Sequence, residues 1–280
     1  MKNNASSLFT LVISCLAAAP ATCLGTLIAS ESFNYSLDGY TAGLEGKAGG
    51  TGFGAEVWKE FGSNANNGIF TETLTVGSDA APTANGPHAR AQLSTAGAGI
   101  GRNLATTVGT DGTQAWLSYR IQNNNTDASE SFAVVFTTLS EARRVIMGAT
   151  SGVGGQSSTD GQFDLAFNPS GANQDYATRD QANHFEVLRF DFGAGNNDTV
   201  TLFQDPTTAT DFFGTGHAQL TGIDATFDGI AFTATGATLR WDEIRIGTTL
   251  ADVTVGVVPE PTTVALVGLG LLGLAFRRRK

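Results

Sequence analysis

WLSYRI, at Trp116–Ile121, is the stretch that decides the fold, because polar and apolar residues alternate along it. A period of two is typical of a β-strand with one buried face. The same alternation appears in FEVLRFDF at Phe185–Phe192, and Phe132–Phe136 is a short apolar run. Thr199–Phe203 follows the turn sequence GNND at Gly195–Asp198, which predicts a hairpin with Phe185–Phe192.

Outward from these strands, the middle of the chain consists of short alternating segments separated by Gly, Asn and Asp. Further strands are expected at residues 230–233 and 239–246, whereas we interpret Ser151–Gly161 and Pro169–Gln181 as polar loops. No amphipathic helical run of useful length interrupts the pattern. The sequence therefore predicts an all-β fold, a single antiparallel β-sandwich or jelly roll over residues 26–254.

Charge and cysteine content restrict the partners of this middle segment. The chain has 16 basic and 26 acidic residues, and setting aside Lys2, Arg277–Lys280 and Glu260 leaves 11 and 25, a net charge of −14. Such acidity disfavours nucleic acid, which needs a basic surface, and it is compatible with divalent cations. Cys15 and Cys23 lie in or beside the N-terminal segment, so the middle holds no disulfide and no thiolate metal site.

The first 25 residues have the three parts of a secretory signal peptide. Lys2 supplies the positive start, Leu8–Ala19 is apolar, and Ala19-Pro20-Ala21 is a small-x-small cleavage site. We predict a helical signal peptide over residues 1–25 that is cut near Ala21 or at Gly25.

The last residues combine a rigid tag, an apolar segment and a basic end. The tag is Pro259, Glu260 and Pro261, the uncharged segment is Thr262–Phe276, and the end is Arg277, Arg278, Arg279 and Lys280. As a helix, this segment spans about 22 Å, whereas a hydrocarbon core is about 30 Å thick. Basic residues favour the cytoplasmic side. The pattern predicts a marginal transmembrane helix within residues 255–280 that acts as a transient anchor, with a permanent single-span anchor as the alternative.

This tail resembles the PEP-CTERM sorting signal. The resemblance implies an exosortase-type membrane transpeptidase as a partner, which recognises Pro259–Pro261 and cuts near it. It also implies that Arg277–Lys280 stay in the cytoplasm while the tag lies at the outer boundary of the inner membrane. The protein is then expected to be exported through the inner membrane, held there transiently, and released to the cell surface or the extracellular space.

A second resemblance covers most of the middle segment. Glu31–Tyr35, Gly49–Phe53 and Trp58 are similar to the opening of PEP-CTERM surface proteins that carry a concanavalin A-like (LamG-like) jelly roll. Trp241–Thr248 resembles the last strand of the same group. The resemblance implies that the first and last strands of the domain lie side by side.

Catalytic motifs were sought on this expected fold. Glucanases of the fold place two Glu around an Asp as Glu-x-Asp-x-x-Glu on one strand face, and no such run occurs in the sequence. Asp242 and Glu243 are adjacent, so on a regular strand they point to opposite faces. His88, His184 and His217 are scattered and form no zinc motif. We therefore predict a non-catalytic protein, with a glycan-cleaving enzyme of another site pattern as the alternative.

Calcium is the cofactor that the sequence favours, because its ligands are carboxylate and carbonyl oxygens. Glu31 and Asp242 stand at the two ends of the domain, and the jelly-roll resemblance brings them together around a structural ion. The alternative is that both are solvated carboxylates, or that they pair with Arg240 or Arg245.

Sugar binding needs an exposed aromatic ring beside hydrogen-bonding side chains. Trp116 and Trp241 sit in apolar strands and are expected in the core, whereas Tyr176 lies in a polar stretch and is the expected ligand-binding ring. The residues and resemblances together predict an exported, surface-sorted, non-catalytic protein. Its expected role is structural or carbohydrate-adhesive in the cell envelope or extracellular matrix, with polysaccharide as a partner.

Overall fold

The computed structural model describes most of the middle segment of the chain. The described residues are 25–35, 44–61, 65–70, 88–93, 98–123, 131–137, 144–149, 162–168, 170–195, 197–214, 216–235 and 238–254. Most of the predicted signal peptide, the predicted loop Ser151–Gly161 and the tail Pro259–Lys280 lie outside these residues. Within the described ranges, no helix is long and apolar enough to cross a membrane.

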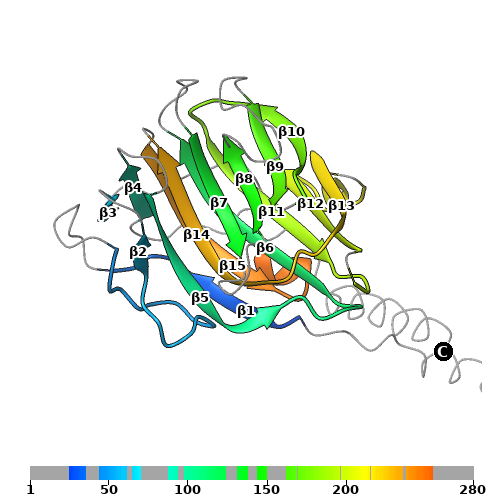
Figure 1. Ribbon diagram of the computed structural model, residues 1–280, viewed down its shortest axis with the longest axis horizontal. Coiled ribbons are helices and arrows are strands. Elements are labelled where there is room, and N and C mark those ends of the chain that lie inside the picture. Colours follow the sequence, from blue (N-terminus) through cyan, green and yellow to red (C-terminus); the bar gives the residue numbers. More distant parts are fainter. Residues whose placement is uncertain are drawn as a thin grey trace, which may run out of the picture. The chain divides into compact units, whose positions relative to one another are not determined.

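Two antiparallel β-sheets face each other (Figure 1). Among the described residues, the first sheet has eight strands, and β1 (Leu27–Glu31) pairs with β15 beside the main path. From edge to edge, that path is β13 (Ala218–Ile223), β12 (Asp198–Gln204), β11 (Asn183–Asp191), β6 (Gln114–Asn123), β15 (Thr238–Gly247), β4 (His88–Leu93) and β3 (Ala65–Phe70).

The second sheet has seven strands within the described residues. Their order is β10 (Ala172–Thr178), β9 (Gln162–Asn168), β8 (Arg144–Ala149), β7 (Ser131–Thr137), β14 (Phe227–Thr235), β5 (Ala98–Val108) and β2 (Lys59–Phe61). Along the described strands, the chain changes sheets after β1, β2, β4, β5, β6, β10, β13 and β14. As a result, β14 inserts between β5 and β7, and β15 lies between β6 and β4. The predicted all-β, antiparallel two-sheet sandwich is confirmed.

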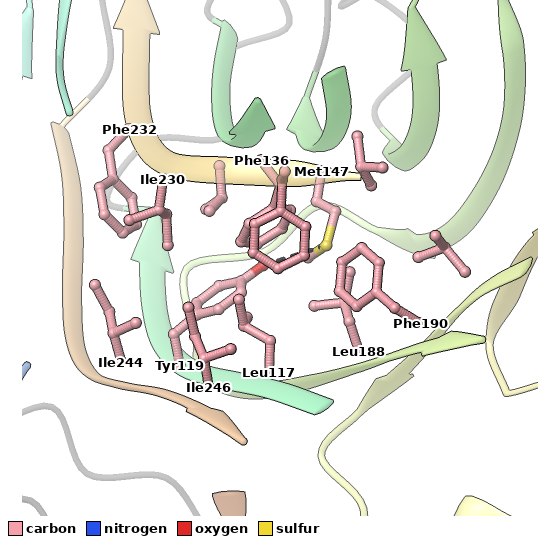
Figure 2. Close-up of a cluster of buried hydrophobic side chains, with 14 of the residues drawn as sticks. Leu117, Tyr119, Phe136, Met147, Leu188, Phe190, Ile230, Phe232, Ile244 and Ile246 are labelled. Atoms are coloured by element: carbon pink, nitrogen blue, oxygen red, sulfur yellow. Dashed lines mark hydrogen bonds between the residues drawn. The ribbon is translucent and has the colours of Figure 1, made fainter. Parts of the chain in front are cut away.

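The core lies between the two sheets (Figure 2). The first sheet contributes side chains from β6, β11 and β15, namely Leu117, Tyr119, Leu188, Phe190, Ile244 and Ile246. The second sheet contributes Phe136, Met147, Ile230 and Phe232. Phe232 stacks on Trp241 across the sandwich, with ring centroids 4.3 Å apart. Each such buried side chain stabilises the fold by about 1.5–3 kcal/mol, so the core needs no disulfide.

The outer face of the first sheet carries a second, smaller apolar cluster. Its members are Trp116, Phe185, Val187, Phe203, Phe212 and Val253. Two short helices supply the last two side chains, η1 (Ala209–Phe212) and α2 (Leu250–Val253). Ser118 on β6 donates its hydroxyl to the Val253 carbonyl at 2.8 Å, which fixes α2 on the sheet. Trp241 is therefore in the main core as predicted, whereas Trp116 lies in the outer cluster.

Two expectations about local structure are confirmed and one is wrong. β11 and β12 pair as the predicted hairpin, and the terminal strands β1 and β15 lie side by side, with Glu31 opposite Ile244. The predicted loop Pro169–Gln181 instead contains the strand β10. β10 is the last strand of its sheet, and an edge strand can keep the polar, half-exposed side chains that suggest a loop.

Candidate functional site

The loop between β12 and β13 carries the candidate site. β12 ends at Gln204, and Asp205 then turns the chain with a φ of 47°. A non-glycine residue rarely adopts this left-handed conformation; the Asp205 carboxylate secures it by accepting the Phe185 backbone N–H at 2.8 Å. At the far end, Gly216 has a φ of +64°, and a Cβ there would lie 2.3 Å from the Leu202 carbonyl oxygen, so this turn requires glycine.

Within this loop, η1 exposes one aromatic ring and buries another. Asp211 accepts the backbone N–H groups of Thr208 at 2.8 Å and Thr207 at 2.6 Å, which caps the helix. These hydrogen bonds lower the pKa of Asp211 to about 2, so its carboxylate is negative at neutral pH. Phe212 packs into the outer cluster with 2% of its surface exposed, whereas the next residue, Phe213, is 80% exposed.

Phe213 lines two surface cavities, which we call the acidic hollow and the aromatic hollow. The acidic hollow has a volume of about 570 Å³, and its polar lining comes from Gln204, Asp205, Thr210, Asp211 and His217. The aromatic hollow has a volume of about 340 Å³ and is lined by Gln114, Trp116, Arg189, Phe212, Thr248, Thr249 and Leu250. An exposed ring thus stands between two cavities that offer hydrogen-bonding groups.

A histidine clamped by two aspartates supports the acidic hollow. His184 Nδ1 lies 2.6 Å from Asp205 Oδ2, and its Nε2 lies 2.8 Å from Asp180 Oδ1. Burial alone would lower the pKa of His184, but the hydrogen bonds to Asp205 and Asp180 raise it to about 9. The imidazole is therefore positive at neutral pH and holds Asp205 in place from behind the hollow.

The aromatic hollow has a guanidinium that is already neutralised. Arg189 Nε donates to Asp191 Oδ2 at 2.8 Å, and its guanidinium lies 5.9 Å from the centre of the Trp116 ring. Gln114 links the two sides, because it donates to Asp191 at 2.5 Å and accepts the Trp116 indole N–H at 2.7 Å. This network fixes the orientation of Trp116 at the base of the hollow.

The predicted calcium ligand Glu31 is buried, and its charge is balanced within the chain. Its carboxylate lies 3.4 Å from Arg102 Nη1 and accepts the Tyr35 hydroxyl at 2.6 Å. Arg102 also donates to the Gly49 carbonyl at 2.7 Å and to the Glu56 carbonyl at 2.9 Å. The partner of Glu31 is therefore Arg102, and neither Arg240 nor Arg245 takes that place.

Asp242, the other predicted ligand, lies in an irregular part of β15. The register of β15 with β6 shifts after Asp242, and Glu243 has a φ of 50°, so the strand bulges where regular alternation was assumed. Burial and then the Glu243 carboxylate raise the pKa of Asp242 to about 8, while Arg120, opposite it in the register, acts against this. The Glu31 carboxylate makes a smaller contribution to the raised pKa of Asp242. In the described part of the chain, no three His, Cys, Asp or Glu residues gather closely enough to hold a metal ion, and a shared calcium stays a prediction.

Tyr176, the predicted ligand-binding ring, packs inward from β10. Its ring stacks on Phe163 with centroids 5.8 Å apart, and its hydroxyl donates to Glu186 at 2.9 Å. Tyr119 donates to the same carboxyl group at 2.5 Å. The expectation of an exposed ring at Tyr176 is wrong, because an internal carboxyl group attracts the hydroxyl.

The exposed ring is Phe213, which the sequence analysis missed. The signal available was the pair Phe212-Phe213 inside a Thr- and Gly-rich stretch, after the capping pattern Thr208-x-x-Asp211. Two adjacent aromatic residues at the end of one helical turn cannot both face the same cluster. The site can therefore stack a ring-shaped ligand on Phe213 and accept or donate hydrogen bonds on both sides of it.

Comparison with known proteins identifies the tail and leaves the domain without a named function. Residues 257–280 match the model of the PEP-CTERM protein-sorting motif. No curated protein matches the chain in sequence.

Several solved structures are similar over much of the chain. A protein of unknown function from Shewanella oneidensis MR-1 has 13% identity and a TM-score of 0.47, covering 93% of this chain and 99% of that one. The calreticulin globular domain of T. cruzi has 11% identity and a TM-score of 0.42, covering 80% and 89%. The endo-β-1,4-glucuronan lyase of the fungus Trichoderma reesei has 11% identity and a TM-score of 0.39, covering 66% and 90%. None of these likenesses is strong enough to transfer an activity. What is shown is a chain with an all-β antiparallel sandwich and a C-terminal PEP-CTERM sorting motif, which implies export and surface sorting by an exosortase.

Proposed function

We propose that this is an exported, surface-sorted and non-catalytic protein that adheres to carbohydrate through Phe213 and the two hollows beside it. The observation that carries the proposal is the 80% exposure of Phe213, which lines both a mainly polar cavity and a mainly apolar one. An aromatic ring buries up to 150–250 Å² when it is covered, at roughly 25 cal/mol per Å². A sugar ring offers an apolar face to such a side chain and hydroxyl groups to the polar lining.

The chemistry of the acidic hollow favours binding over bond cleavage. A general acid is most effective when its pKa lies near the working pH, whereas hydrogen bonds from Thr208 and Thr207 hold the pKa of Asp211 at about 2. Asp205 is committed to the Phe185 N–H and to His184. Each Asp205 oxygen takes only one of these hydrogen bonds and can accept another from a bound ligand. Asp211 already accepts four hydrogen bonds from Thr207 and Thr208, so it contributes its charge.

The tail supports the location of this role. We propose that Thr262–Phe276 anchors the protein transiently in the inner membrane and that an exosortase cuts near Pro259–Pro261. The domain is then released to the cell surface or extracellular matrix, where polysaccharide is its partner. Mass spectrometry of the mature protein from a host with the sorting enzyme tests this step, and a C-terminus that still ends at Lys280 would mean a permanent anchor.

Affinity electrophoresis of the purified protein through gels that contain single polysaccharides tests adhesion. Phe213→Ala is expected to weaken retention about tenfold, as for a central aromatic contact. Leu27→Ala is the matched control, because Leu27 is another exposed apolar side chain, 41% exposed, and it lines neither hollow. Equal losses in both variants would contradict the site.

The alternative of a glycan-cleaving enzyme is tested on the same polymers. The assay looks for new reducing ends or unsaturated products over time. Turnover that disappears in Asp205→Asn would favour the enzyme and overturn the non-catalytic proposal.

A further inference from the structure

We infer that the acidic hollow selects glycans with free amino groups and rejects glycans with carboxylate groups. The inference rests on the proposed function, since it names the ligand class of the same site. It is carried by the charges that line the cavity and by the hydrogen bonds those charges already make.

The lining of the acidic hollow has negative charge and no basic side chain to balance it. Its ionisable members are Asp205, Asp211 and His217, and neither Lys nor Arg lines this cavity among the described residues. His217 Nδ1 accepts the Gln204 backbone N–H at 3.1 Å, which ties this side chain to the end of β12.

The histidine behind the hollow offsets only part of this charge. His184 contacts Asp205 and Asp180, so two carboxylates share one imidazolium and leave a charge of −1. Asp211 adds a second negative charge, because Thr208 and Thr207 hold the pKa of its carboxyl at about 2. The acidic hollow therefore presents a net negative charge to a bound ligand.

Asp205 also has acceptor capacity left, whereas the Asp211 carboxylate already accepts four hydrogen bonds from Thr207 and Thr208 and contributes its charge. Each Asp205 oxygen takes one hydrogen bond from the protein, from Phe185 N–H on one side and His184 on the other. A carboxylate oxygen can accept two. An ammonium group has three N–H donors and a positive charge, so it matches both properties, whereas a uronate brings a third acceptor-only anion.

The aromatic hollow offers no competing anion site. Its guanidinium, Arg189, is paired with Asp191 at 2.8 Å, so a carboxylate there would have to displace an existing partner. Discrimination between amino and carboxylate glycans bound at Phe213 is therefore expected to come from the acidic hollow.

A matched pair of ligands isolates the charge. Isothermal titration calorimetry at low salt compares the purified protein with glucosamine hexamers, their N-acetylated counterparts and guluronate hexamers. We expect the free amine to bind about five- to tenfold more tightly than the N-acetyl form, with the preference falling as salt rises. The guluronate hexamer is expected to bind more weakly than either.

Two variants separate the outcomes. Asp211→Asn should reduce the preference for the amine to less than about threefold, because it removes a negative charge from the lining. Glu45→Gln, an exposed carboxylate that lines neither hollow, should leave the preference unchanged. If Asp211→Asn disturbs the loop, both affinities fall together, and Asp205→Asn then decides by the same ratio.

Equal binding of amine and N-acetyl forms, or tighter guluronate binding, with Phe213→Ala still weakening all of them, would overturn this inference alone. Binding of none of these ligands, or binding that ignores Phe213→Ala, would overturn the proposed function and this inference with it.

Discussion

Glu31 and Glu186 are equally buried, each 3% exposed, yet the chain satisfies them in different ways. Glu31, on β1, lies 3.4 Å from the guanidinium of Arg102. Glu186, on β11, receives the hydroxyl groups of Tyr119 at 2.5 Å and Tyr176 at 2.9 Å. Strands β15 and β6 separate β1 from β11 in the sheet order, so these are two distinct solutions to burying a carboxyl group.

This difference determines how the two buried carboxyl groups respond to a change in pH. A guanidinium group is in effect a permanent positive charge in proteins. Burial raises the pKa of Glu186, and the Tyr119 hydrogen bond and the nearby His184 only partly oppose this. The Glu31 carboxylate therefore has a permanent counter-charge beside it, whereas Glu186 has a raised pKa and two tyrosine hydroxyl groups as its partners.

The largest expected effect comes from breaking the Glu31 pair. Arg102→Ala leaves a buried carboxylate without its counter-charge and removes two hydrogen bonds to the loop, so we expect a loss of about 3–5 kcal/mol in the free energy of unfolding. Urea denaturation at pH 7 measures it. Lys59→Ala is the control, because the Lys59–Glu56 pair is 59% and 47% exposed and should contribute about 1 kcal/mol or less. Similar losses in the two variants would contradict the role of Arg102.

A smaller effect is expected in the Glu186 region. Tyr119→Phe removes the shorter hydrogen bond to a fully buried carboxyl group, and we expect a loss of about 1.5–3 kcal/mol. Tyr176→Phe removes the longer hydrogen bond, from a partly buried ring, so the expected loss is about 0.5–1.5 kcal/mol. The same denaturation experiment compares them. A larger loss in Tyr176→Phe would mean that Glu186 depends mainly on β10.

The strands were predictable from the sequence because successive side chains of a β-strand point to opposite faces of the sheet. At Trp116–Ile121, Leu117 and Tyr119 enter the main core while Trp116 and Ser118 face outward. The pairing of β1 with β15 came from the resemblance to jelly-roll surface proteins, and the register confirms it.

The partners and the site were not predictable, because they depend on which strands the fold brings together. Glu31 and Arg102 lie on different sheets and are 71 residues apart, so no local pattern links them. Tyr176 lies in a polar strand, and its hydroxyl donates to Glu186, which lies on a strand of the other sheet. Phe213 is exposed because Phe212 takes the buried position, a choice that only the packed loop makes.

The smallest expected effect concerns His184, whose charge changes with pH, in contrast to the guanidinium of Arg102. The pKa of His184 is about 9 in the fold against about 6.5 in an unfolded chain. A raised histidine pKa stabilises the fold fully below about pH 6.5, and that contribution is lost as pH rises through about 9. Asp180 and Asp205 are 51% and 39% exposed, so solvent screens the pair and we expect a loss of about 1 kcal/mol.

Urea denaturation of the parent protein and of His184→Gln at pH 7 and pH 10 measures this loss. Ionisations elsewhere in the chain act equally on both proteins, so the difference between their two losses isolates His184 and its aspartates. The parent should lose about 1 kcal/mol more than the variant over this interval. Adding Arg102→Ala to each protein should leave that difference unchanged, because a guanidinium does not titrate in this range. A difference that vanishes in the Arg102→Ala background would mean that the Arg102–Glu31 pair and the His184 pairs are coupled through the fold and are not independent.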